Sequence, residues 1–492
     1  MAKKTDDEQE PLYPFPMAPV SNGEWCPLPI TENQIRVAQL VIEETTARAK
    51  RHGMSRAQFL KTAAATMTAF MCMNKVYGYD QDGDNAMLPV KKQHCDDLDA
   101  AREVLDKKQW FIMDVQQHHV DLDKFGNTGD FFCFLDFIKA PGTTCPQSIG
   151  QLEYIRQIFV NSETNVGVIS GLPAGIPCGP AQMAKTRDLI NQLAGSERAL
   201  SQVVCDPKAP VDTETAIANM EHQVRDLKGR ALKCYTYSYN GWRLDDADGT
   251  AMLEEATRLG IELVNTHKGL PAIFAPGSPE TVRTIDYPGA LKNFPKMKFM
   301  AYHSGFFQGD THPEGKAGIT EWIEVLESLD KKDRRRMYSE IGSTFGFNLV
   351  ADQGDAPGQE QFRIAHLLGQ LVKTLGSRNV IWGTDSVWWG SPQFLIDAFK
   401  TMQIPASLQE QFGYPQLTDK VKKRILGENA ARLYHVKPKQ ERCTVPASSV
   451  DQLALLQAEQ GGPREGRSLR AIGPQTRRGF LAMLRNEWRP YI

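Results

Sequence analysis

From residue 109 onward, short runs of β-branched and aromatic residues alternate with amphipathic stretches of helical length. A strand followed by a helix, repeated along a chain, indicates parallel βαβ units. Eight repeats favour a closed (β/α)8 barrel of the TIM type over an open doubly wound sheet. A dinucleotide-binding sheet is further disfavoured because no GxGxxG motif follows the first run. The expected strands span residues 109–115, 165–170, 200–205, 231–237, 261–266, 297–302, 337–342 and 379–384. The clearest helices between them span residues 181–194, 213–228, 318–331 and 359–375.

The barrel pattern divides the chain into three segments. They are a mostly helical N-terminal extension at 1–108, the barrel at 109–435 and a C-terminal tail at 436–492. In the extension, Thr31 and Gln34 form a capping-box pattern that predicts a helix to about residue 50. The tail holds ten Lys and Arg against five Asp and Glu. We interpret it as a solvated strap over the barrel or a neighbouring subunit, with nucleic-acid binding as the weaker alternative.

The composition excludes several classes of protein. A net charge of −2 over 492 residues gives no bias toward nucleic acid or an anionic membrane. No apolar stretch reaches the roughly 20 residues that span a bilayer. Nine cysteines, odd in number and without a CxxC pair, argue against a disulfide framework and fit a reducing, cytoplasmic compartment. We expect a small-molecule substrate, no nucleic-acid or membrane partner, and a homo-oligomer.

Residues 55–73 have two interpretations. The run SRAQFLK at 55–61, followed by small and apolar residues, resembles a twin-arginine export signal. However, Ala57 replaces one arginine, and the run lies some fifty residues inside the chain, whereas export signals lie near the N-terminus. We favour a buried helix that begins at Ser55, with Gln58 completing a capping box.

The ends of the expected strands carry the chemistry. Catalytic groups of such barrels lie at the C-terminal ends of the strands, because the loops there form the mouth. Four of the ten histidines fall at the ends of strands 1, 5 and 6, and an aspartate ends strand 8. These residues are His118, His119, His267, His303 and Asp385. Imidazole and carboxylate suit a borderline cation such as Zn²⁺, so the pattern predicts one divalent metal ion, Zn²⁺ or alternatively Mn²⁺.

Two segments carry a family resemblance. Strand 8 reads NVIWGTD at 379–385, and a closing helix reads ILGENAARLY at 425–434. Both resemble the amidohydrolase superfamily, in the branch that includes aminocarboxymuconate-semialdehyde decarboxylase and many metal-dependent hydrolases. That branch has Asp-x-His-x-His on strand 1, His on strands 5 and 6, and Gly-Thr-Asp on strand 8. The resemblance covers roughly residues 109–435.

The resemblance implies roles for four residues. His118, His267 and Asp385 would hold one metal ion, and Asp385 would also accept the proton of the attacking water. His303 would polarise or orient without binding the metal, although a packed strand-end residue is the plain alternative. We therefore take Asp385 and His303 as the expected catalytic residues.

The chain departs from the family at Gln116. Aligning Asp114-x-Gln116-x-His118 with the motif places glutamine where the first histidine ligand belongs. An amide oxygen is a weak ligand for zinc. Gln116 has three interpretations. It is a fourth ligand of a weakened site, it indicates that the site prefers a harder metal ion such as Mn²⁺, or it indicates that the metal site has been lost. Rescue by His119 would require a bend, because neighbouring residues of a regular strand face opposite sides.

Five residues are candidates for the substrate side of the site. Lys233 binds an anionic substrate group, is carbamylated to bridge a second metal, or simply extends to solvent. Tyr235 and Trp388 would line an apolar pocket. Glu340 pairs with Lys233 or serves acid–base chemistry, and His119 completes the set.

Three functions are compatible with this pattern. A hydrolase would direct a metal-activated water at a carbonyl or ester-like carbon, and we favour it. A non-oxidative decarboxylase of a small aromatic or unsaturated acid is the alternative, because some related decarboxylases carry an oxygen ligand at the position of Gln116. A metal-free barrel with a binding role is the third.

We predict that residues 54–73 stay in the mature protein. Mass spectrometry of the protein from its native host would locate the mature N-terminus. A start beyond about residue 75 would favour the export interpretation instead.

Overall fold

The computed structural model describes most of the chain. The described residues are 13–15, 17, 30–106, 108–121, 150–172, 178–208, 211–237, 241–270, 279–307, 318–350, 362–387, 390–438 and 445–459. None of the helices in these ranges is both long and apolar enough to cross a membrane.

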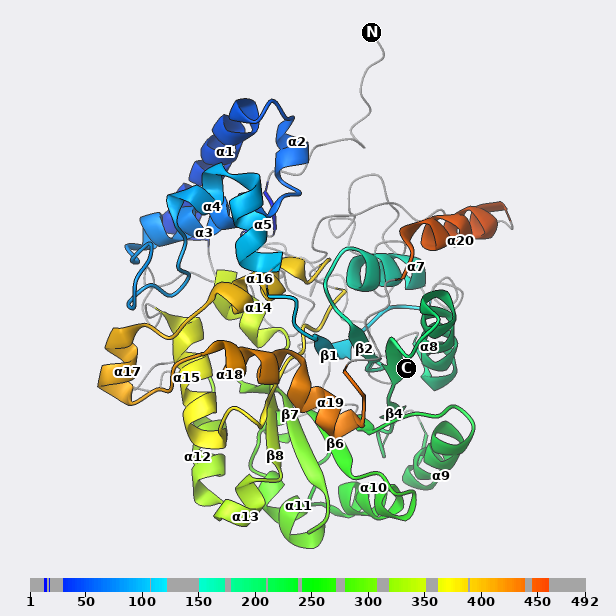
Figure 1. Ribbon diagram of the computed structural model, residues 1–492. Helices are drawn as coiled ribbons and strands as arrows, with labels where there is room; N and C mark the ends of the chain where they lie inside the picture. The colour runs from blue at the N-terminus through cyan, green and yellow to red at the C-terminus, as the bar shows by residue number, and fades with distance from the viewer. Residues whose placement is uncertain are drawn as a thin grey trace.

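Parallel strands form the centre of the molecule (Figure 1). They are β1 (Met113–Gln117), β2 (Val166–Ile169), β3 (Ala199–Ser201), β4 (Val203–Val204), β5 (Leu232–Tyr235), β6 (Leu263–Gly269), β7 (Lys298–Phe306), β8 (Met337–Glu340) and β9 (Val380–Ile381). β3 and β4 are the two halves of one strand, separated by Gln202. Each strand pairs in parallel with the next along the chain.

The last strand closes onto the first. Val115 N donates to Trp382 O at 3.2 Å, and Asp385 N donates to Gln116 O at 3.0 Å. A parallel bridge joins Gln117 to Ser386. The eight strands therefore form a closed (β/α)8 barrel, as predicted. All eight predicted runs contain a strand, with ends displaced by up to a few residues.

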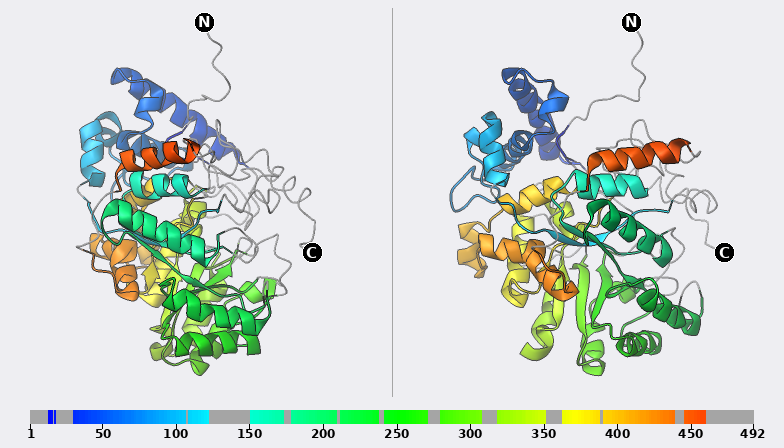
Figure 2. Two further views of the ribbon diagram at one scale, coloured as in Figure 1. Left: turned by 90° about the vertical axis from the view of Figure 1, so that its right-hand side faces the viewer. Right: turned by 45° about the vertical axis from the view of Figure 1, so that its right-hand side comes forward.

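Helices surround the barrel (Figure 2). Those between and after the strands are α7 (Gln151–Ile155), η4 (Arg156–Val160), α8 (Pro180–Ala194), α9 (Thr213–Arg225), α10 (Ala247–Arg258), η5 (Pro279–Val282), α11 (Tyr287–Asn293), α12 (Thr320–Ser328), α13 (Lys331–Arg334), α14 (Thr344–Val350), α15 (Arg363–Leu375), α16 (Gln393–Thr401), α17 (Ala406–Phe412), α18 (Asp419–Lys423), η6 (Arg424–Glu428), α19 (Asn429–Tyr434) and α20 (Ala447–Glu459). The four helices that the sequence predicted are α8, α9, α12 and α15, which confirms them.

The barrel interior is packed rather than open. Side chains from β1, β2, β3, β6, β7, β8 and β9 form a single apolar cluster, among them Met113, Val168, Met300 and Ile381. The hydroxyl of Tyr434, from α19, accepts hydrogen bonds from Gln202 Nε2 and Asn265 Nδ2 inside the barrel. The closing helix thus fills the end of the barrel that lies away from the C-terminal strand ends.

The N-terminal extension is helical, as predicted. Its helices are α1 (Glu32–Arg51), α2 (Arg56–Phe59), α3 (Ala63–Tyr77), α4 (Lys92–Asp96) and α5 (Leu98–Asp106). Both predicted capping boxes form, at Thr31 with Gln34 and at Ser55 with Gln58. The segment after Ser55 is two helices rather than one, because Thr62 caps a new helix, the largely buried α3.

The extension packs against the helices that follow the last two strands. Gln34 Nε2 donates to Val350 O of α14, and Gln403 Nε2, just after α16, donates to Gly83 O. At the other end of the chain, α20 lies along α7 and contacts η4 (Figure 2), and Val450 is buried in the same apolar cluster as Ile155 of α7. The part of the predicted tail that the structure describes therefore includes a packed helix.

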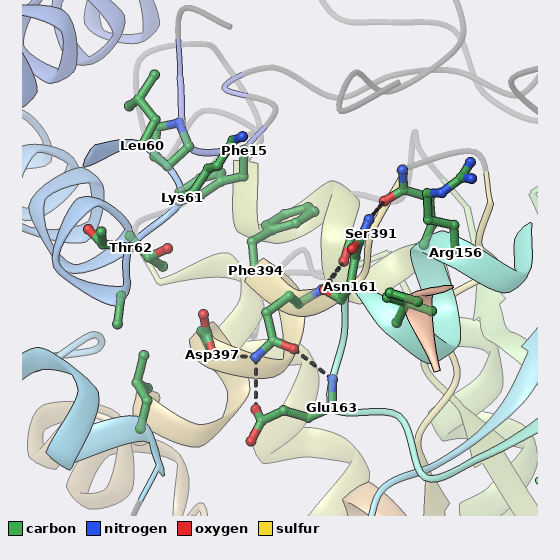
Figure 3. Close-up of a pocket in the computed structure, with 18 of the residues that line it drawn as sticks. Phe15, Leu60, Lys61, Thr62, Arg156, Asn161, Glu163, Ser391, Phe394 and Asp397 are labelled. Carbon is green, nitrogen blue, oxygen red and sulfur yellow. Dashed lines mark hydrogen bonds between the residues drawn. The ribbon is translucent and has the colours of Figure 1, made fainter. Parts of the chain in front are cut away.

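A cavity of about 870 Å³ lies between the extension, η4, α16 and α20 (Figure 3). Phe15 reaches its edge from the N-terminal segment. The ring of Phe15 stacks on Phe394 of α16, with 5.0 Å between centroids, and tilts against Phe70 of α3 at 5.7 Å. Phe15 is buried, so it joins the extension to the barrel.

We predict that Phe15→Ala lowers the free energy of unfolding by about 3 kcal/mol, because it removes a buried ring shared by two parts of the fold. Urea denaturation followed by circular dichroism measures the change. Leu455→Ala is the control, since that side chain is 65% exposed and its loss should cost less than about 0.5 kcal/mol. Equal stability of the two variants would show that the Phe15 ring does not stabilise the packing of the extension against the barrel.

Candidate functional site

The C-terminal ends of the strands bring most of the predicted residues together. On β5, Leu232 and Cys234 belong to the core outside the barrel, so Lys233 and Tyr235 face inward. Tyr235 pairs in register with His267 on β6, and His267 pairs with Tyr302 on β7. These side chains form a ring of buried polar and aromatic groups beneath the mouth.

A register shift in β1 turns the metal-motif residues inward. Met113 and Val115 face the barrel interior, so in a regular strand Gln116 would face outward. The shift between Asp114 and Gln117 reverses the alternation, and the side chains of Gln116 and His118 both reach the site. Bulges commonly redirect side chains next to active sites. The bend lies before His118 and does not turn His119 inward.

Four side chains converge on one point. Gln116 Nε2 lies 2.9 Å from Asp385 Oδ1, 3.2 Å from His303 Nε2 and 3.5 Å from His118 Nε2. His118 Nε2 lies 2.9 Å from the same Asp385 oxygen. All four residues are buried. We call these four residues, Gln116, His118, His303 and Asp385, the strand-end centre.

The backbone is strained at this centre. His303, Ser304, Ser343 and Asp385 have φ of 61°, 53°, 57° and 56°, in the left-handed region that side-chain-bearing residues rarely adopt. Such conformations cluster at functional sites, where surrounding structure enforces them. Two of the four are the predicted catalytic residues, Asp385 and His303.

Asp385 is held ionised by its neighbours. Burial raises the pKa of this carboxyl group, but the hydrogen bond with His118, the electrostatic interactions with His118 and His303, and the hydroxyl of Ser343 together hold the pKa below its ordinary value. Ser343 Oγ donates to Asp385 Oδ2. Sequence reasoning missed Ser343, because nothing in its local pattern distinguishes it from an ordinary loop serine.

Burial keeps two histidines of the site, His267 and His303, in the neutral form. Burial lowers the pKa of His303 to about 4, with the charge of Lys233 acting in the same direction and that of Asp385 opposing it. Burial, with the charges of His303 and Lys233, also lowers the pKa of His267 well below its usual value. The two rings lie 4.5 Å apart between centroids. His303 Nδ1 is 2.8 Å from the Gly342 carbonyl, which can only accept, so the proton is on Nδ1 and Nε2 carries a lone pair.

Glu340 is enclosed below the centre. Its two carboxylate oxygens accept hydrogen bonds from the backbone N–H groups of His303 and Gly342. A Cβ at Gly342 or Gly383 would overlap Glu340 Oε1, so only glycine at these positions leaves room for the carboxylate. Burial raises the pKa of Glu340 to about 8, although the two backbone hydrogen bonds oppose that rise. Glu340 is therefore largely protonated at neutral pH.

Lys233 is a buried cation on the wall of the site. Its Nζ lies 3.8 Å from the ring centroid of Tyr302 and 4.5 Å from that of Tyr235. Cation–π contacts of this kind stabilise an ammonium group away from water. The side chain is fully buried, so the interpretation that it extends to solvent is wrong.

His119 does not lie with the other predicted residues. Its ring packs against Tyr154, at 5.3 Å between centroids, and lies 3.8 Å from Cys178 Sγ. Tyr154 and Cys178 belong to the apolar cluster under α7 and α8, outside the barrel. His119 therefore neither replaces Gln116 nor contacts the centre, which corrects that expectation. Trp388 lies outside the described residues.

The donor atoms decide whether the centre suits a metal ion. Within the described part of the chain, no three His, Cys, Asp or Glu side chains form a group that could hold a metal. Besides His303, which is not an expected ligand, the strand-end centre offers the imidazole of His118, the carboxylate of Asp385 and the amide of Gln116, whose Oε1 is buried with no hydrogen-bond partner among the described residues. Nitrogen and oxygen donors of this kind fit Zn²⁺ or Mn²⁺ if Gln116 contributes its oxygen.

Comparison with known proteins gives a family match. The Amidohydrolase family model matches residues 181–436, which is more than half of the chain. The match begins after β2 and leaves β1 outside. No curated protein matches the sequence.

Several solved structures are similar in shape at low identity. A 5-carboxyvanillate decarboxylase from Sphingomonas paucimobilis is 14% identical, with a TM-score of 0.42 over 67% of this chain and 100% of that one. A 5-carboxyvanillate decarboxylase from Novosphingobium aromaticivorans, complexed with manganese and 4-hydroxy-3-methoxy-5-nitrobenzoic acid, is 9% identical, with a TM-score of 0.42 over 67% and 97%. A Pseudomonas putida protein described as a 2-pyrone-4,6-dicarboxylic acid hydrolase is 13% identical, with a TM-score of 0.40 over 66% and 98%.

We predict that Glu340 makes the protein less stable as pH rises. Its folded-state pKa of about 8 exceeds its ordinary value of 4.5, so the native state binds the proton more tightly than the unfolded state. The stabilisation is full below pH 4.5 and is lost as pH rises toward about 8. Relative to Glu340→Gln, the wild type should lose up to about 1.4 kcal/mol of unfolding free energy per pH unit over this window.

Urea denaturation of both proteins at pH 5, 6, 7 and 8 measures the difference. The variant loses a hydrogen bond to the backbone at every pH. The test is therefore how the difference in unfolding free energy between the two proteins changes with pH, and not its size at any one pH. Glu324→Gln, at an exposed position on α12, should give no slope. If the difference in unfolding free energy between the wild type and Glu340→Gln also stays constant with pH, Glu340 is already ionised at neutral pH.

Proposed function

The chain belongs to the amidohydrolase family, whose members are metal-dependent enzymes, and on this basis we propose that the strand-end centre is the active site of a hydrolase. The substrate is a small organic molecule, attacked by water at a carbonyl or ester-like carbon. The observation that carries the proposal is the convergence of Asp385, His118 and His303 within 3.5 Å of one atom of Gln116. These groups are buried at the C-terminal strand ends, where barrels of this type place their chemistry.

His118 and Asp385 would hold the metal ion, with Gln116 and His267 completing its ligands. His267 Nε2 lies 3.1 Å from the Leu270 carbonyl, so its proton is on Nε2 and Nδ1 is the nitrogen with a lone pair. A divalent cation, Zn²⁺ or Mn²⁺, supplies Lewis-acid polarisation of a substrate oxygen when bound. The assignment of these ligands is part of the proposal.

Asp385 is the proposed proton acceptor. Its low pKa keeps it ionised at neutral pH, and Ser343 fixes one of its oxygens. His303 is neutral and presents the lone pair of Nε2 to the same point, so it can accept a hydrogen bond from the attacking water or orient the substrate. The strained backbone at both residues fixes these atoms before substrate arrives.

A decarboxylase is the second candidate, and Lys233 favours it. Its ammonium lies against two tyrosine rings on the wall of the site. A buried cation attracts a carboxylate, and the rings of Tyr235 and Tyr302 would pack against an aromatic acid. On this proposal the substrate loses carbon dioxide, and a proton takes its place on the ring carbon.

One assay separates the two candidates. The protein, supplied with Zn²⁺ or Mn²⁺, is incubated with a panel of lactones, amides and aromatic carboxylates. Products are identified by mass spectrometry, and carbon dioxide is measured from carboxyl-labelled acids. Release of labelled carbon dioxide identifies the decarboxylase, whereas a product or pair of products that together equal the substrate plus one water identifies the hydrolase.

We predict that protein purified without chelator carries about one Zn²⁺ or Mn²⁺ per chain. Asp385→Asn should lower activity by about 10²–10⁴-fold, because it removes the proton acceptor, and should lower metal content while leaving the circular dichroism spectrum unchanged. The control is Asp188→Asn, at a side chain that is 67% exposed. Full activity of a metal-free preparation would contradict the proposal.

A further inference from the structure

The amide nitrogen of Gln116 occupies the middle of the strand-end centre. It lies within 3.5 Å of one atom each of Asp385, His303 and His118. Its own residue is 1% exposed, so these contacts are made away from water. A metal ion held by His118 and Asp385, as proposed above, would have to approach the same point.

Both hydrogens of this amide have acceptors. Asp385 Oδ1 is an anionic acceptor at 2.9 Å. His303 Nε2, at 3.2 Å, carries a lone pair because the proton of that ring is donated to the Gly342 carbonyl. The –NH₂ group therefore donates one hydrogen bond to the carboxylate of Asp385, which follows β9, and one to the imidazole of His303 on β7.

Hydrogen bonds hold the backbone of Gln116 in place, whereas its side-chain oxygen has none among the described residues. Gln116 N donates to Asp114 Oδ1 at 3.1 Å, and Gln116 O accepts from Asp385 N at 3.0 Å. The side-chain oxygen makes no such contact within the described residues and lies over Gly342, where a Cβ would crowd it. A half-turn of the amide would exchange Nε2 for Oε1 and present an oxygen to the centre.

We propose that the Gln116 amide and a metal ion compete for the same two atoms, Asp385 Oδ1 and His118 Nε2. Without metal, the amide holds these groups together. With metal, the amide turns and offers its oxygen as a weak ligand. The centre is consequently stable without its ion and exchanges the ion readily. This inference rests on the proposed metal-dependent function.

The test compares Gln116→Glu and Gln116→His with the wild type, each stripped by a chelator. A glutamate at 116 keeps the shape but sets a second carboxylate beside Asp385 and donates no hydrogen bond. We expect the melting temperature of chelated Gln116→Glu to fall well below that of the chelated wild type and to recover with Mn²⁺. We expect Gln116→His to bind Zn²⁺ roughly tenfold or more tightly than the wild type in competition with a chelating dye, because imidazole is the better ligand.

Gln117→Glu is the matched control. Gln117 is also buried on β1, but its side chain accepts from Tyr154 outside the barrel. Its glutamate variant should also be destabilised, but Mn²⁺ should not restore it. Recovery confined to Gln116→Glu would support the inference.

Two results would overturn the inference. One is a chelated wild type as unstable as chelated Gln116→Glu, since the amide would then not replace the ion. The other is equal zinc affinity of the wild type and Gln116→His. Failure of every variant, Gln116→His included, to bind metal would instead overturn the metal-dependent function, while the melting temperatures in chelator would still test the amide link.

Discussion

The carboxylate of Asp114 joins the first strand of the barrel to the last, and the site depends on this contact. Its Oδ1 accepts from the backbone N–H groups of Gln116 and Thr384, each at 3.1 Å, and its Oδ2 accepts from Thr384 Oγ1 at 2.5 Å. Burial raises its pKa to about 7, against the opposing effect of these hydrogen bonds. The same contact therefore closes the barrel and positions Asp385, which follows Thr384 directly.

Closure also maintains the strain at the centre. Asp385 and His303 hold left-handed backbone conformations, each of which costs of order 1–3 kcal/mol. The parallel ladders on both sides and the packed interior supply the stabilisation that offsets this cost. Glycine at 342 and 383 leaves space for Glu340 beneath the centre. The surrounding structure, rather than the intrinsic backbone preference of each residue, therefore holds Asp385 and His303 in position.

The glutamine at position 116 stands where the resemblance to the amidohydrolase superfamily implies a histidine ligand. The family match begins at residue 181, after the strand that carries the departure. His267, His303 and Asp385 lie within the matched range, and Gln116 lies outside it. In a metal site of the kind proposed, a neutral amide in place of an imidazole would weaken metal binding without moving the site.

Local patterns in the sequence determined the helices, the eight strands and the residues at the strand ends. Alternation, capping boxes at Thr31 and Ser55, and strand–helix repeats act over a few residues, so they can be read without a structure. The sequence did not determine the faces of Gln116 and His119, because a register shift depends on pairing with neighbouring strands. The contact of Ser343 with Asp385 joins residues 42 positions apart. Only the closed barrel brings such groups together, since their contacts arise from packing between distant segments rather than from local preference.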